Sequence, residues 1–292
     1  MKHDAPAKAF DNAVDRSTAG GVMEFATHVF AVADAEFLKL RNDPIELLMR
    51  AAQPLLWLLI FGRVMGQVRG LTVGSMNYVD FLAPGVLAQS VLFAAIFYGI
   101  AAIWERDLGI VHRYLVSPAS RTALIMGKQL SSSIRGLAQA VIIYFTALVL
   151  GLSIDFHPAK ILGVVLLIAL GSAVFSTFSL IVACIVRNRE RFMGIGQVIT
   201  MPIFFASNAI YPLDLMPRWL KMIAAFNPFT YEVDGLRMLM LRVPVNPSGL
   251  FLDISVLVAV SATLLIIAAR LYPRITSCSS ALPLRYRKLR KR

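Results

Sequence analysis

The sequence has little charge and almost no cysteine. Asp, Glu, Lys and Arg make up only 16% of its 292 residues, whereas soluble domains carry about 25%. Its two cysteines, Cys184 and Cys278, are too few for a disulfide framework and have no metal-ligand spacing. These shortages argue against an ordinary soluble domain and against a small secreted domain held together by disulfides.

Several motifs are also absent. There is no GxxxxGKS/T phosphate-binding loop, so we do not expect this chain to bind ATP in that way. The metalloprotease motif HExxH and the hydrolase motif GxSxG are missing as well. Asp80, Glu105 and Asp253 lie near the ends of apolar runs, whereas ion-driven carriers commonly need a carboxylate in mid-membrane. We therefore expect no catalytic residue, metal or cofactor in this chain, and an energy source in another subunit.

Long apolar runs dominate what is present. Hydrophobic residues make up 58% of the chain. Several runs are long enough to cross about 30 Å of hydrocarbon at 1.5 Å per residue of helix. This pattern predicts an all-α polytopic membrane protein. We expect six transmembrane helices, at residues 45–65, 78–103, 134–152, 161–186, 192–209 and 251–272.

The two ends of the chain differ from the spans. Residues 1–20 are polar and lack a repeating pattern, which predicts a disordered cytoplasmic tail. Over 21–41 apolar residues recur at helical spacing between charges, which predicts an N-terminal interfacial helix lying along the membrane surface. Residues 42–272 would form the six-span domain, and 273–292 a basic cytoplasmic tail beside anionic lipid.

The basic residues predict the orientation. The formal net charge is +12, but Lys and Arg gather at the ends of apolar runs, which argues against a nucleic-acid partner. Of the 29 Lys and Arg residues, 22 fall on one side of the predicted spans and 7 on the other. The positive-inside rule therefore predicts a multi-pass protein of the plasma (inner) membrane with both termini in the cytoplasm.

A charged stretch, WERDLGIVHRYLVSP at 104–118, lies on the predicted cytoplasmic side. Leu108, Val111 and Leu115 are spaced along one edge of a helix, and Pro118 would end it. A short amphipathic helix parallel to the membrane is an element that a cytoplasmic motor domain can push. The alternative is an ordinary basic loop between two spans.

Two short helices are predicted on the outer side, within 212–242. The first has an apolar stripe made of Met216, Trp219, Leu220, Ile223 and Phe226. An Asn–Pro pair follows this stripe and should end the helix.

The second outer helix has a stripe of Val233, Leu236 and Met240. We expect its charged residues to point away from that stripe; these are Glu232, Asp234 and Arg237. Four residues of the outer region could form an outer gate: Tyr211, Pro212, Trp219 and Phe226. The alternative is that the aromatic residues belong to the belt that membrane proteins place at the interface.

Three stretches carry a resemblance to a known family. They are FLAPGVLAQS at 81–90, ERDLGIVHRYLVSPASRTALIMGK at 105–128 and MPIFFASNAIYPLDLMPRWLKMIAAFNPFTYEVDGLR at 201–237. In this order they resemble the membrane subunits of type-2 ABC exporters, a family that includes daunorubicin-resistance and nodulation-factor export permeases. The resemblance extends over residues 22–272.

The resemblance implies a connecting helix at 22–40, six spans, a coupling helix around 105–117 and paired outer helices. It also implies two permease chains packed together, expected to be a homodimer, each over a separate cytoplasmic subunit that binds ATP and Mg. Membrane lipids would surround the pair. The residues expected at the contact with the ATP-binding subunit are Glu105, Arg106, Leu108, Gly109, Leu115, Ser117 and Pro118.

The expected function is outward transport of a hydrophobic or amphipathic molecule, such as a drug, lipid or glycolipid, by a permease subunit that is not itself an enzyme. One alternative is a polysaccharide or lipo-oligosaccharide exporter, but no stripe of polar and aromatic residues is apparent in the spans. The other is a membrane enzyme or assembly factor with no transport role, for which the sequence supplies no polar catalytic cluster.

Overall fold

The computed structural model describes residues 44–67, 76–107, 121–186, 188–242 and 249–271. Over these residues the chain is helical and contains no strand; an isolated bridge joins Ile154 and Leu241. The elements are α2 (Pro44–Leu56), the π-helical turn η1 (Trp57–Phe61), α3 (Gly62–Gly66), α4 (Tyr78–Asp107), α6 (Arg121–Val149), α7 (Pro158–Ile185), α8 (Arg189–Phe205), the 3₁₀ turn η2 (Leu213–Leu215), α9 (Arg218–Phe226), α10 (Pro228–Met240) and α11 (Leu250–Leu271).

Four helices contain segments that are long and apolar enough to cross a membrane. These segments are Tyr78–Phe97, Ile125–Val149, Pro158–Ile185 and Leu250–Leu271. They correspond to the predicted second, third, fourth and sixth spans. The predicted first and fifth spans correspond to shorter helices, Ala51–Gly66 and the 17-residue α8. The interfacial helix at 21–41 and the two tails lie outside the described residues.

One predicted span belongs to a longer helix. We expected a span to begin at residue 134, but α6 begins at Arg121. The segment 121–149 contains no proline, so nothing in its backbone prevents a continuous helix from beginning at Arg121. The charges and serines at its start limit how deep the helix can lie in hydrocarbon, but they do not interrupt its hydrogen bonding.

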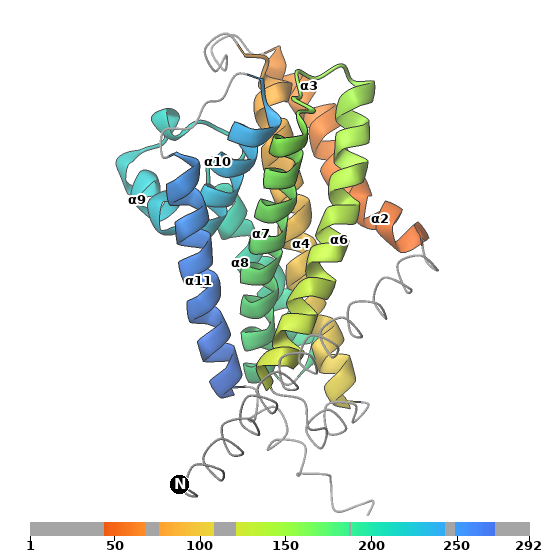
Figure 1. The fold of residues 1–292 in the computed structure, drawn as a ribbon, viewed down its shortest axis with the longest axis vertical. Coiled ribbons are helices and arrows are strands. Elements are labelled where there is room, and N and C mark those ends of the chain that lie inside the picture. Colours follow the sequence, from red (N-terminus) through yellow and green to blue (C-terminus); the bar gives the residue numbers. More distant parts are fainter. Residues whose placement is uncertain (1–43, 68–75, 108–120, 187, 243–248, 272–292) are drawn as a thin grey trace, which may run out of the picture.

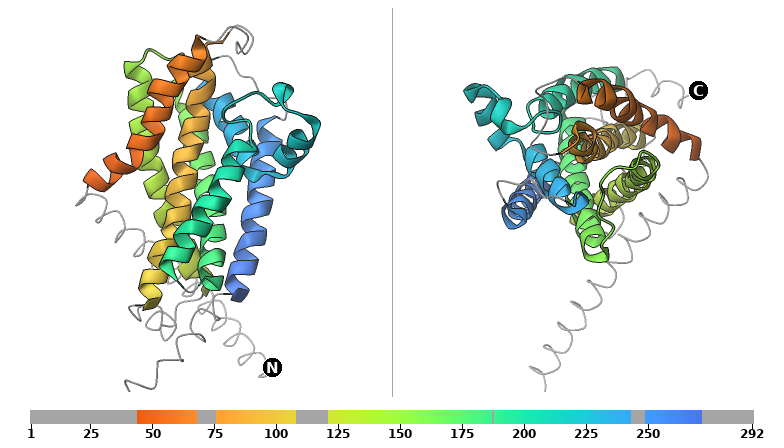
Figure 2. Two further views of the ribbon diagram at one scale, coloured as in Figure 1. Left: turned by 180° about the vertical axis from the view of Figure 1, so that it is seen from behind. Right: turned by 90° about the horizontal axis from the view of Figure 1, so that it is seen from above.

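The helices form a bundle with α4 near its centre (Figures 1 and 2). Almost every α4 side chain between Phe81 and Ala95 is buried, because α6, α7, α8 and α10 all pack against it. By contrast, α11 buries only Asp253, Leu257 and Ala268. The last turn of α4 and the first turns of α6 and α8 lie at one end of the bundle, and α9 and α10 lie toward the other (Figure 1).

Small and polar residues fill the contacts among α4, α6 and α7. The backbone N–H of Gly99 donates to the hydroxyl of Ser179 at 3.1 Å, and Gln129 donates to the hydroxyl of Thr177 at 2.6 Å. A side chain at Gly99 would overlap Ser179, so this close approach requires glycine. The buried polar residues of these three helices include Gln89, Ser90, Lys128, Ser131, Ser132, Ser133, Gln139, Ser172, Ser176, Thr177 and Ser179.

The expected absence of a stripe of polar and aromatic residues concerns a wide channel, whereas these buried polar residues are mostly small and lie on helices of one chain. Next to Gln129 and Thr177 the free space is only about 10 Å³, which is at the lower limit for holding one water molecule. These residues therefore act as packing in the described bundle.

Candidate functional site

The segment that follows α8 is held tightly against α4. The Tyr78 hydroxyl donates to the carbonyl of Ile210 at 2.8 Å. A Cβ atom on Gly85 would lie 2.5 Å from the carbonyl oxygen of Ala209, so only glycine lets the two backbones approach this closely. The start of the outer region is thus fixed to the central helix of the bundle.

Asn227 fixes the junction of α9 and α10 to the end of α8. Its side-chain amide donates to the carbonyls of Ile203 at 2.7 Å and Ala206 at 3.3 Å. Its carboxamide oxygen accepts from the backbone N–H of Phe229 at 3.1 Å and so caps α10. The sequence predicted the helix break at Asn227 but not these contacts, because their acceptors lie more than 20 positions earlier in the chain.

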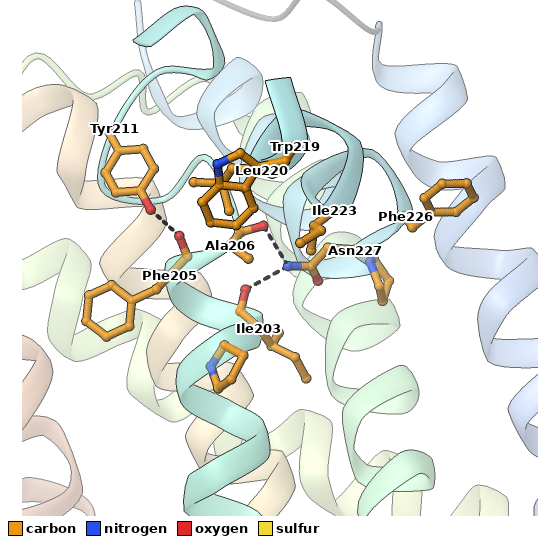
Figure 3. Close-up of a pocket in the computed structure, with 11 residues that line it drawn as sticks. Ile203, Phe205, Ala206, Tyr211, Trp219, Leu220, Ile223, Phe226 and Asn227 are labelled. Atoms are coloured by element: carbon orange, nitrogen blue, oxygen red, sulfur yellow. Dashed lines mark hydrogen bonds between the residues drawn. The ribbon is translucent and has the colours of Figure 1, made fainter. Parts of the chain in front are cut away.

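A pocket of about 610 Å³ lies between the end of α8 and α9 (Figure 3). Apolar side chains form most of its wall, and the Tyr211 hydroxyl donates to the carbonyl of Phe205 at one side of it. The lining residues are Pro202, Ile203, Phe205, Ala206, Tyr211, Trp219, Leu220, Ile223, Phe226, Asn227 and Pro228.

The pocket brings together three of the four residues predicted as an outer gate. Tyr211, Trp219 and Phe226 line it, whereas Pro212 does not. Trp219 is 61% exposed and Phe226 is 91% exposed. An apolar wall with exposed aromatic rings can hold an apolar ligand, and it offers no group for covalent chemistry.

The charged residues of α10 were expected to point away from its apolar stripe, but the structure buries them as well as the stripe. Asp234 and Arg237 are each only 2% exposed. Arg237 lies 3.3 Å from the carboxylate of Asp234 and donates to the carbonyl of Asn208 at 2.9 Å, while the Asn208 amide donates to Asp234. The guanidinium also lies over the Phe81 ring of α4, 3.9 Å from its centroid. The pair is therefore buried and joins α10 to α4 and to the segment after α8.

Glu232 is buried more completely than this pair. It is 0% exposed, and neither carboxyl oxygen has a hydrogen-bond partner among the described residues. Its carboxyl group lies against Gly171 of α7, where a Cβ atom would come within 2.0 Å of it. Burial raises the pKa of Glu232 well above its usual range, so the environment favours the neutral acid. The sequence gave no sign of this, because a carboxylate on a short outer helix is normally solvated.

The structure describes only the first part of the predicted coupling helix. Residues 104–107 belong to the last turn of α4, so Glu105 and Arg106 extend the span helix instead of starting a separate one. Beside them, the Arg189 guanidinium of α8 lies 3.7 Å from the centroid of the Trp104 ring and joins the two helix ends. Leu108, Gly109, Leu115, Ser117 and Pro118 lie outside the described residues.

Comparison with known proteins gives one family. The sequence profile of the family described as ABC-2 type transporter matches residues 27–241. A protein of Cyanophora paradoxa named as a transport permease, ycf38, is 28% identical over 74% of this chain and 74% of its own length. The daunorubicin resistance ABC transporter permease protein DrrB1 of Streptomyces coeruleorubidus is 25% identical over 80% of this chain and 81% of its own. Nodulation protein J of Rhizobium leguminosarum bv. viciae is 26% identical over 66% and 74%. The matched region contains both the pocket between α8 and α9 and the buried charges of α10.

Proposed function

The chain belongs to the ABC-2 type transporter family, and we propose that it is the permease subunit of an exporter that moves a hydrophobic or amphipathic molecule outward. Membership makes it a multi-pass membrane subunit of an ABC transporter, a class that works with an ATP-binding subunit. The family match is the observation that carries the proposal. It agrees with a bundle that has four long apolar helices.

The proposed topology has six spans, with α2–α3 and α8 crossing in addition to the four long helices. At 1.5 Å per residue α8 is about 26 Å long, slightly less than an average hydrocarbon core. The excess of Lys and Arg on one side supports cytoplasmic termini and an inner or plasma membrane location. In this orientation the Trp104–Arg189 contact faces the cytoplasm, and α9 and α10 face outward.

We further propose that two copies of this chain assemble with two ATP-binding subunits, which bind ATP and Mg. Glu105, Arg106 and the segment through Pro118 would contact the ATP-binding subunit. Because Arg189 packs on Trp104, a push on the end of α4 would also reach α8. The pocket at the far end of α8 would then respond to the motor, with Tyr211, Trp219 and Phe226 as its outer gate.

One relative supports the proposed substrate class, a hydrophobic or amphipathic molecule. This relative is named for daunorubicin resistance, which supports outward movement of such a molecule. The alternative is a polysaccharide exporter, for which the spans show no stripe of polar and aromatic residues.

The test is to co-purify the tagged chain with its ATP-binding subunit in mild detergent and to compare ATPase activity with transport in vesicles. We expect Glu105→Ala to insert normally and to lower transport at least tenfold while ATP hydrolysis continues. Asp214→Ala is the matched control, because Asp214 is an exposed carboxylate in η2, just before α9, and α9 lies toward the opposite end of the bundle. Unchanged transport in Glu105→Ala would remove Glu105 from the coupling contact, and a chain that purifies without any ATPase would contradict the proposed assembly.

A further inference from the structure

We propose that the pocket between α8 and α9 is a binding site for one acyl chain of an anionic phospholipid from the outer leaflet. This lipid is a resident ligand of the permease and not the exported molecule. The inference goes beyond the proposed function, and it rests on the proposed placement of α9 at the outer membrane surface.

The first argument is the two-sided composition of α9. At 100° per residue, Trp219, Leu220, Ile223 and Phe226 fall on one side of the helix, and these four line the pocket. Arg218 and Lys221 fall on the opposite side, and both are exposed. A helix with Trp, Phe and Leu on one face and basic residues on the other lies in the membrane interface, with its apolar face toward the acyl chains. The pocket beneath that face is therefore at the depth of acyl chains.

The second argument is that the pocket is already formed. Asn227 joins the α9–α10 junction to Ile203 and Ala206, and Tyr211 donates to Phe205, so hydrogen bonds hold the wall in place (Figure 3). Its volume of about 610 Å³ falls within the usual range of small-molecule pockets, roughly 300–1,000 Å³. A hydrocarbon chain fits such a wall without leaving any of its own polar groups unpaired.

The third argument is charge. α9 contains Arg218 and Lys221 and no acidic residue. A lipid whose chain enters the pocket has its phosphate at the level of this helix, where long basic side chains can reach it. A zwitterionic headgroup gains less from the two charges than an anionic one. The arrangement thus selects the headgroup and the chain by separate contacts.

The experiment uses Trp219 as the reporter, because bromine on a lipid chain quenches a tryptophan ring that it touches. The other tryptophans are removed as Trp57→Phe and Trp104→Phe, and the full chain is reconstituted in phosphatidylcholine vesicles. Brominated phosphatidylglycerol and brominated phosphatidylcholine are then compared at equal mole fraction. We expect phosphatidylglycerol to quench with about fivefold higher apparent affinity, the effect of about one basic residue near an anionic lipid. The exposed part of the ring gives a background common to both lipids.

Matched variants separate the two contacts. Ala206 lines the pocket, so Ala206→Phe should abolish the preference, and the milder Ala206→Leu should reduce it. Ala225→Phe adds the same bulk at an exposed position of α9 that does not line the pocket, and it should change nothing. Arg218→Gln with Lys221→Gln should make the two lipids equivalent while Trp219 is still quenched.

Three results would overturn the proposal. Equal quenching by both lipids in the parent protein would show contact with bulk lipid only. A preference that persists in Ala206→Phe would place the anionic lipid on the surface of α9 and not in the pocket. Absence of quenching by either lipid would mean that a second protein chain covers the site. None of these readouts needs ATP or transport, so their failure is distinct from a failure of the proposed exporter function.

Discussion

The two outer helices are neighbours in sequence and opposites in environment. α9 and α10 meet at Asn227, and both have an apolar stripe interrupted by charges. Yet Ala224 is the only buried residue of α9, whereas α10 buries ten of its 13 residues, including Glu232, Asp234 and Arg237. The difference arises because α10 packs against α4, α7 and α11, whereas α9 lies at the edge of the bundle (Figure 2). Similar sequence patterns thus produce a buried helix in α10 and a surface helix in α9.

If α10 holds the α9–α10 region to the bundle, breaking its ion pair should have the largest effect on the stability of the protein. Asp234→Ala leaves the Arg237 guanidinium buried without its carboxylate and removes an acceptor of Asn208. We expect a loss of about 3–5 kcal/mol in stability, measured by thermal unfolding in detergent. Lys221→Ala on exposed α9 should change stability by less than about 0.5 kcal/mol.

A double variant sharpens this first prediction. Asp234→Ala combined with Arg237→Leu removes both charges, so it should be more stable than Asp234→Ala alone. If the double variant is as unstable as the sum of the two single changes, the pair does not interact as the structure shows.

The contact of Glu232 with Gly171 should give the next largest effect. Gly171→Ala would place a Cβ atom 2.0 Å from the Glu232 carboxyl, so the buried Glu232 side chain or α10 must shift. We expect a loss of about 1–3 kcal/mol from overpacking. Gly194→Ala on α8 is the matched control, because a Cβ atom there meets nothing within 4 Å, and it should be neutral or stabilising by up to about 1 kcal/mol. Equal losses in the two variants would contradict the assigned contact.

The buried carboxyl also predicts a pH effect of smaller size. The pKa of Glu232 is raised in the folded protein, so the protonated form favours folding. Its contribution is complete below the ordinary value of 4.5 and is lost as pH rises through the higher folded value. Glu232→Gln cannot ionise, so its stability should fall less between pH 5 and 8, by a margin on the order of 1 kcal/mol. Unfolding curves with parallel pH slopes would refute this.

The smallest effect on stability is expected on α9. Trp219 is 61% exposed, so Trp219→Ala should cost less than about 1 kcal/mol. If Trp219 is part of the outer gate, the same variant should lower transport severalfold at unchanged assembly with the ATP-binding subunit. Transport in vesicles, compared with Ala225→Phe, measures this. We expect variants of α9 to affect transport and variants of α10 to affect stability. An α9 variant that unfolds the protein, or an α10 variant that changes only transport, would contradict this difference.

This contrast also shows what the sequence can predict. The end of α9 was predictable, because Pro228 lacks the backbone N–H that a continuing helix needs as a hydrogen-bond donor. The apolar stripe of α9 was predictable too, because its residues recur at the helical period. The burial of Arg237 was not, since it depends on Phe81 and on the carbonyl of Asn208, which lie far away in the sequence. A charged residue is normally solvated, and only the folded neighbours decide otherwise.

The same reasoning applies to the membrane segments. Length and hydropathy predicted the helices now seen as α4, α7 and α11, because these properties are local. The start of α6 was missed because Lys128 and Arg135 limit how much of the helix can lie in hydrocarbon, but they do not interrupt the helix itself. At the pocket, the sequence predicted three aromatic residues, but it could not predict that Asn227 would join α9 to the end of α8.

The buried length of α4 has a mechanical consequence. Tyr78 and Trp104 lie 26 positions apart on α4, about 39 Å along its axis, and they make the hydrogen bond to Ile210 and the contact with Arg189. A tilt of α4 by about 5° would move its far end by about 3 Å. Because Arg189 begins α8 and Ile210 follows it, a small rotation of α4 at one end of the bundle would become a displacement of atomic size at the other.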